Sequence, residues 1–235
     1  MNFDNVVSIE DDNGLKTNLR ENNKTKELMN AFDYNIIGVG DSQFIGIQSI
    51  ISNGNNAAES IDGENLKTII LKNTIVYPFV GDSREDARVI LDTVEYFKNP
   101  NNYNYEGPTY TASYLCTPHQ PFLFGENGEM NSSLQYFDWS TPSLYVNQSK
   151  YIEKLILEIT ESIVKNDPNA VIILQSDHSV RSGATIEEAD KQLILNAVYF
   201  SGQDISEIDG KSGVDTLRIV FNKIFNLDLK LLGGE

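Results

Sequence analysis

Residues 171–178 read Val-Ile-Ile-Leu-Gln-Ser-Asp-His, and this stretch decides the fold that we predict for the chain. Its first four residues are continuously apolar, and a polar turn at 166–169 separates them from a preceding helical stripe. A short apolar run that follows a helix is typical of a parallel strand buried on both faces. We therefore expect an α/β fold, with a largely parallel sheet covered by helices on both faces.

The sequence on either side of this strand alternates between helical and strand patterns, as that fold requires. The clearest helical stripe precedes the strand and consists of Ile152, Leu155, Ile156, Ile159 and Ile163. Further strands are expected at 34–39, 110–116 and 193–200, and helices at 23–32, at 83–98, from Thr185 onward and at 214–225. Segments 52–63 and 123–141 read as loops, because Gly, Asn and Ser are frequent in both.

The composition is that of a folded, acidic protein. Hydrophobic residues make up 40% of the 235 residues and the formal net charge is −16, with no local excess of Lys and Arg. Such a surface repels polyanions, so we expect neither nucleic acid nor an anionic membrane surface as a partner. Cys116 is the only cysteine, which excludes an intrachain disulfide, and its place after Tyr114-Leu115 predicts a core position.

No segment of the sequence has the pattern of a membrane anchor or a secretion signal. The first twelve residues contain four acidic and no basic side chains, unlike a signal peptide, and no apolar run is long enough to span a membrane. The chain expressed alone is therefore expected to be soluble and cytoplasmic.

The two histidines of the chain, His119 and His178, are the main candidates for chemistry. Each follows a predicted strand, and functional groups of open α/β sheets gather outside the carboxyl ends of strands. Asp177 directly precedes His178, and a carboxylate beside an imidazole suits zinc, manganese or a similar divalent ion. The competing interpretation is that both histidines are structural or merely exposed.

Several segments, in the same order along the chain, resemble sulfatase-like domains of the alkaline phosphatase superfamily. Residues 171–178 resemble that family's metal-binding strand, which ends in Asp-His-Gly, and Thr117–Phe124 followed by Gly128 resembles its Pro-His-Pro-Phe segment. The helix at 145–164 and the segments 196–200 and 217–225 also fit, so that the resemblance covers residues 110–232 best. Such domains occur in bacterial membrane-anchored sulfatases and lipoteichoic acid synthase-like proteins.

The resemblance implies an alkaline phosphatase-like α/β/α sandwich and a metal-dependent hydrolase or transferase acting on sulfate or phosphate esters. By position, Asp177 and His178 would be metal ligands, for Mn, Zn, Ca or Mg. His119 would be catalytic, beside the substrate oxyanion or leaving group, or would serve a second metal. Arg181 would either pair with an anionic substrate or be a solvated surface arginine.

The sequence departs from the family in three respects. We identify neither the family's nucleophile nor its early metal-binding aspartate, Ser179 replaces the glycine after Asp-His, and the membrane-spanning segments of its extracytoplasmic relatives are absent. We therefore expect residues 1–235 to form a single sulfatase-like domain without its N-terminal nucleophile portion. Such a C-terminal portion would not be catalytically self-sufficient and could require a complementing N-terminal chain. The alternative is a non-catalytic remnant or accessory domain that retains the fold.

Overall fold

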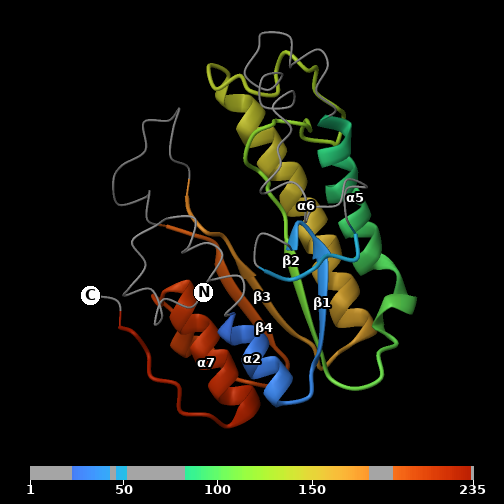
Figure 1. Ribbon diagram of the computed structural model, residues 1–235. Helices are drawn as coiled ribbons and strands as arrows, with labels where there is room; N and C mark the ends of the chain where they lie inside the picture. The colour runs from blue at the N-terminus through green and yellow to red at the C-terminus, as the bar shows by residue number, and fades with distance from the viewer. Residues whose placement is uncertain (1–22, 43–45, 52–82, 180–192, 234–235) are drawn as a thin grey trace, which may run out of the picture. The chain divides into compact units, whose positions relative to one another are not determined.

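The computed structural model describes residues 23–42, 46–51, 83–179 and 193–233 (Figure 1). Its contacts divide the chain into two compact units, Met1–Ser162 and Ile163–Glu235. The sequence itself marks no boundary there, because residues 162 and 163 both lie inside helix α6 (Pro142–Asn166). The loop predicted at 52–63, the helix predicted from Thr185, and Arg181 lie outside the described residues.

A parallel strand pair forms the centre of the first unit. Strands β1 (Asn35–Gly40) and β2 (Thr109–Tyr114) pair in parallel, with Asn35 opposite Thr109 and Gly40 opposite Tyr114. A further segment bridges β1 at Gly38, opposite Ser49. A side chain at residue 38 would prevent this approach, because its Cβ would lie 2.4 Å from the carbonyl oxygen of Gln48.

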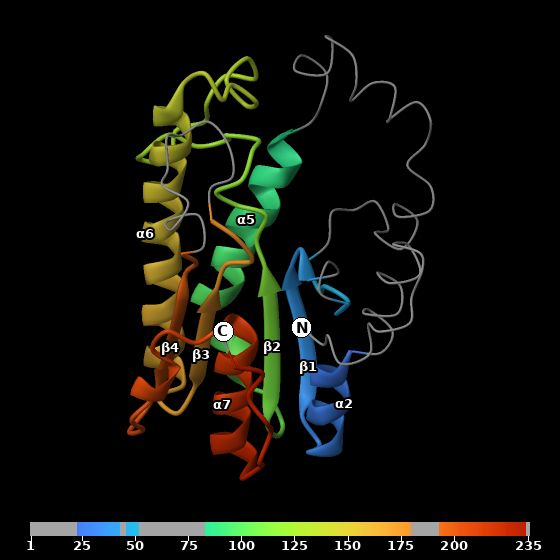
Figure 2. The ribbon, with the colours of Figure 1, turned by 90° about the vertical axis from the view of Figure 1, so that its left-hand side faces the viewer.

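Helices flank β1 on both sides. Helix α2 (Lys24–Ala31) and helix α5 (Ser83–Lys98) both contact β1, and the two views place them on opposite sides of the strand (Figures 1 and 2). Asn23 caps α2 by accepting a hydrogen bond from the amide of Lys26. Helix α5 ends before Asn99 and Pro100, as predicted, and the 3-10 helix η2 (Pro100–Tyr103) follows it.

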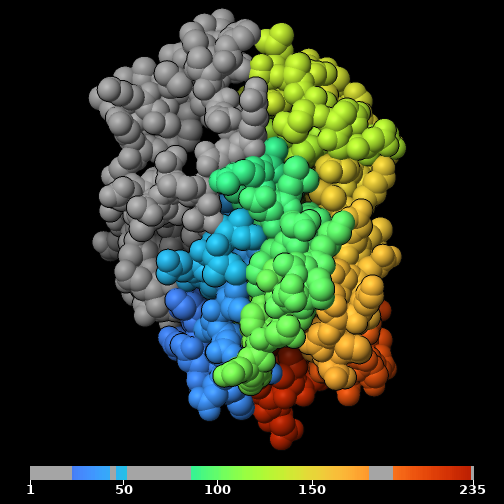
Figure 3. All heavy atoms as spheres, turned by 90° about the vertical axis from the view of Figure 1, so that its right-hand side faces the viewer, coloured from blue at the N-terminus to red at the C-terminus, as the bar shows by residue number. Residues whose placement is uncertain are grey.

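The long helix α6 lies beside α5 and provides one wall of the core. Figure 3 shows the two helices side by side, and Lys98 at the end of α5 pairs with Glu158 of α6 at 2.7 Å. The buried positions of α6 recur every three or four residues, as on one face of a helix. They are Leu144, Gln148, Ile152, Leu155 and Ile159. Between β2 and α6, the start of the predicted loop at 123–141 and the residue before it are buried, as Phe122, Leu123 and Phe124.

The second unit contains an antiparallel strand pair, which corrects the prediction for residues 171–174. Strand β3 (Val171–Gln175) pairs antiparallel with β4 (Asn196–Phe200), with Val171 opposite Phe200. Within β3 only Ile172 is buried, so the strand is not enclosed on both faces as we expected. The described strands therefore form one parallel and one antiparallel pair, and the fold they establish is mixed α/β.

Helix α7 (Gly213–Phe225) completes the second unit, after the short 3-10 helix η4 (Ser206–Ile208). Ser212 caps its N-terminus by accepting a hydrogen bond from the amide of Asp215, and Asn226 ends it in the left-handed conformation (φ 51°). The prediction of Asn226 as the C-cap is thus confirmed. Among the helices of the described segments, none has the length and apolarity needed to cross a bilayer.

Candidate functional site

Asp177 and His178 follow strand β3 after a single intervening residue, Ser176. Both side chains are accessible, with relative exposures of 50% for Asp177 and 35% for His178. His178 Nε2 lies 3.8 Å from Asp177 Oδ2, so the two groups face the same small volume of solvent. The structure therefore brings this predicted pair together at the end of a strand, in an accessible position.

A backbone contact determines which nitrogen of His178 faces the carboxylate. His178 Nδ1 lies 2.7 Å from the carbonyl oxygen of Ser179. A carbonyl oxygen only accepts, so Nδ1 carries the proton and donates it. In the neutral ring Nε2 is then the unprotonated nitrogen, and it points toward Asp177. In metal sites, a histidine ligand is oriented in the same way, by a hydrogen bond from the ring nitrogen that does not bind the metal.

The spacing of the two groups is close to that of ligands on one metal ion. Tetrahedral zinc with bonds of about 2.0–2.1 Å holds adjacent ligand atoms about 3.3 Å apart. The observed 3.8 Å exceeds this by about 0.5 Å, so the two atoms would have to approach one another to share an ion. Two groups alone make a weak site, however. In the segments that the structure describes, no three His, Cys, Asp or Glu side chains gather closely enough to hold a metal.

His119 lies in the first unit, beyond the carboxyl end of β2. Its ring is exposed, and its Nδ1 lies 2.7 Å from the carbonyl oxygen of Gln120. As for His178, Nδ1 must be the donor, which leaves Nε2 of the neutral ring able to accept a proton or bind a cation. The exposure of His119 fits a role toward a ligand outside the core.

The segment that carries His119 is held by an aromatic cluster. Phe122 is completely buried, and its ring meets the Trp139 ring edge to face at 4.9 Å. The amide of Phe122 donates to the carbonyl of Tyr136 at 2.8 Å, and the Trp139 indole donates to the side chain of Gln120. Two residues that follow His119 closely, Gln120 and Phe122, are therefore attached to the loop that we predicted at 123–141.

Sequence analysis overlooked Gln148, the buried polar residue of α6. Its side chain is 1% exposed and hydrogen-bonds to the backbone on both sides of His119. A signal was present in the sequence, because Gln148 lies four residues before Ile152 and thus on the same apolar face.

Asp41 is a second residue that we did not single out. It follows β1 directly, and its amide donates to the carbonyl of Tyr114, the last residue of β2, at 2.9 Å. Parallel strands have their carboxyl ends at the same edge, so Asp41 and the segment leading to His119 leave the sheet at one edge. Cys116 belongs to this segment and is exposed, which corrects its predicted core position.

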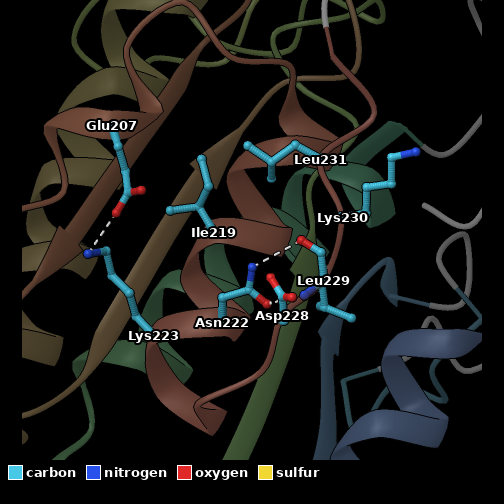
Figure 4. A pocket seen from close by; sticks show the side chains of 8 residues that line it. All are labelled: Glu207, Ile219, Asn222, Lys223, Asp228, Leu229, Lys230 and Leu231. Carbon is cyan, nitrogen blue, oxygen red and sulfur yellow. Dashed lines mark hydrogen bonds and ion pairs between the residues drawn. The ribbon is translucent and has the colours of Figure 1, made fainter.

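The depression beside α7 is a separate feature with structural contacts of its own. It has a volume of about 390 Å³ and is lined by Glu207, Ile219, Asn222, Lys223 and residues 228–231 (Figure 4). Glu207 pairs with Lys223 at 2.6 Å, and Asn222 exchanges two hydrogen bonds with the backbone of Leu229. The ion pair attaches η4 to α7, and the two hydrogen bonds attach the C-terminal segment to α7. Neither Asp177 nor His178 lines the depression.

Comparisons of the chain with protein-family models, with curated proteins and with solved structures found no match.

Proposed function

We propose that this chain is a portion of a metal-dependent, sulfatase-like hydrolase or transferase that acts on sulfate or phosphate esters. The observation that carries the proposal is the Asp177–His178 pair, accessible at the end of β3 with Nε2 directed toward Oδ2 at 3.8 Å. The resemblance of residues 110–232 to sulfatase-like domains, which implies an alkaline phosphatase-like sandwich, supports the same class of enzyme.

Asp177 and His178 would supply two ligands for the ion, as a carboxylate oxygen and an imidazole nitrogen. A bound divalent ion polarises an ester oxygen and lowers the pKa of a coordinated hydroxyl. The resemblance assigns His119, whose ring is exposed, to the oxyanion or the leaving-group oxygen, with which it would exchange a proton.

The alternative function is a non-catalytic or accessory domain that retains the fold. One observation favours it: the described segments contain no cluster of three metal-binding side chains. In that case Asp177 and His178 would not bind a cation, and the protein would not hydrolyse esters.

Calorimetric titration of the purified chain with Mn²⁺ or Zn²⁺ tests the metal site. We expect weak binding that Asp177→Asn and His178→Gln each reduce by at least about tenfold. Asp209→Asn, which removes an exposed carboxylate elsewhere in the second unit, should leave binding unchanged. Binding should also weaken at acidic pH, because protons compete for the imidazole nitrogen. Equal affinity of all four proteins would refute the proposed site.

Hydrolysis of aryl sulfate and aryl phosphate esters with added Mn²⁺ or Zn²⁺ tests the reaction. We expect no appreciable turnover by the chain alone, because two ligands without an identified nucleophile do not provide the covalent step. Robust turnover that Asp177→Ala abolishes would show instead that the nucleophile is present in this chain. Turnover that Asp177→Ala leaves unchanged would assign the activity to another site or to a contaminant.

A further inference from the structure

The side-chain amide of Gln148 is buried between α6 and the segment that carries His119. Its oxygen, Oε1, accepts two backbone hydrogen bonds, from Leu123 at 2.6 Å and from Phe124 at 3.1 Å. A glutamine oxygen has two acceptor positions, so this atom is fully used.

The nitrogen of the same amide faces three backbone carbonyl oxygens. Nε2 lies 3.1 Å from the oxygen of Pro118, 3.0 Å from that of His119 and 3.3 Å from that of Pro121. The two N–H groups of the amide therefore donate to three carbonyl oxygens, so that one N–H is shared between two of them. The orientation of the amide is unambiguous, because the reverse orientation would place Nε2 against two N–H donors and Oε1 against three acceptors.

These contacts matter because residues 118–124 belong to neither a helix nor a strand. Buried backbone N–H and C=O groups of such a segment cannot pair as in a helix or a sheet, so they need other hydrogen-bond partners. Gln148 partners five of them, three on the His119 side and two on the Phe124 side. One side chain of a rigid helix thus connects both halves of the segment.

We propose that Gln148 is a positioning residue that fixes the backbone on which His119 stands. It is itself buried and acts through the carbonyl of His119 and those of the nearby Pro118 and Pro121. The significance of this arrangement for catalysis rests on the proposed function, in which His119 faces the substrate. The positional role is a property of the metal-free protein and can be tested without metal or substrate.

Nitrogen-15 NMR of the histidine rings provides the test, because the chain has only two histidines. In the wild-type protein both rings should carry their proton on Nδ1, since each Nδ1 donates to the next residue's carbonyl. Gln148→Met should release the segment and shift the His119 signals toward those of a free imidazole. The His178 signals should not change, so His178 serves as an internal reference.

Gln148→Glu distinguishes the contacts that Gln148 makes with the two halves of the segment. Its carboxylate still accepts from Leu123 and Phe124, but it offers no donor to the three carbonyls. Amide hydrogen exchange at Leu123 should therefore remain close to wild type in this variant and accelerate roughly tenfold or more in Gln148→Met. The His119 ring signals should change in both variants. Glu153→Met, at an exposed position of the same helix, is the matched control and should change neither signal.

Unchanged His119 ring signals in folded Gln148→Met or Gln148→Glu would overturn the proposal. So would fast exchange of the Leu123 and Phe124 amides in the wild-type protein, a measurement that requires no variant to fold. Metal binding that does not depend on Asp177 and His178, or no metal binding at all, would refute the proposed function and leave these NMR results unaffected. The two failures are therefore distinguishable.

Discussion

Phe122 fills the core beneath the His119 segment, and its replacement by alanine should strongly destabilise the first unit. The ring is 0% exposed, so Phe122→Ala both returns apolar area to water and leaves a cavity, which together cost about 3–5 kcal/mol. The lost edge-to-face contact with Trp139, at 4.9 Å, accounts for about 0.5–1.5 kcal/mol and places the cost in the upper half of that range. For a chain of this length, a loss of about 4–5 kcal/mol lowers the melting temperature by about 8–20 °C.

Urea unfolding followed by tryptophan fluorescence is the appropriate assay. Trp139 is the only tryptophan of the chain and contacts Phe122 directly, so its emission reports on this core alone. Far-UV circular dichroism provides a second probe that does not depend on the environment of Trp139. Leu134→Ala, at a position that is 68% exposed in the same loop, should change the free energy of unfolding by less than about 0.5 kcal/mol.

A loss of stability in Phe122→Ala no larger than that in Leu134→Ala would refute the reasoning. It would mean that the aromatic cluster does not pack as described, and that the segment before α6 is held by other contacts. A large loss seen by fluorescence but not by circular dichroism would show that the cluster unfolds locally.

Three further predictions concern single groups. Ser212→Ala should reduce the free energy of unfolding in urea by about 1 kcal/mol, because the N-cap of α7 is lost, and Ser212→Gly by only a few tenths. Asn226→Ala should cost about 1 kcal/mol in the same assay, because alanine is strained in the left-handed conformation, whereas Asn226→Gly should cost nothing; equal effects would contradict this explanation. Burial raises the pKa of the Tyr110 phenol above its ordinary value of about 10. As the pH rises, Tyr110 therefore ionises in the unfolded chain first, and the stability present below about pH 10 should decrease at higher pH. Tyr110→Phe should reduce this decrease, as measured by the urea midpoints at about pH 8 and pH 10.5.

Local patterns predicted the elements of the described segments well. The apolar spacing at 152–163 and the proline at residue 100 locate α6 and the end of α5, because helix periodicity and proline geometry act within a few residues. Asn226 was predictable as a C-cap for the same reason. Helix α6 nevertheless begins ten residues before the first residue of the apolar stripe, since its first turns bury only Leu144 and Gln148.

The pairing of strands and the contacts of the site were less accessible to sequence reasoning. The apolar run at residues 171–174 is compatible with a parallel or an antiparallel partner. Whether β3 pairs in parallel or antiparallel depends on its partner strand β4, which the run itself does not reveal. The place of Gln148 on the apolar face of α6 indicates burial, but the sequence does not reveal its loop partners, which are up to 30 residues away. Asp177 and His178 are adjacent, which keeps their backbones together in any fold, but successive side chains of an extended chain point to opposite sides. The 3.8 Å between Nε2 and Oδ2 therefore depends on the backbone after β3, and their role as metal ligands stays a prediction.

The exposure of Cys116 gives this protein a single point of chemical attachment. Because the chain has one thiol, a maleimide dye or a nitroxide would label one position without any substitution, three residues before His119. Trp139 is an equally unique emitter within the first unit. A quencher on Cys116 would thus report, in the native sequence, how the segment between strand and helix moves when a metal ion or an ester is added.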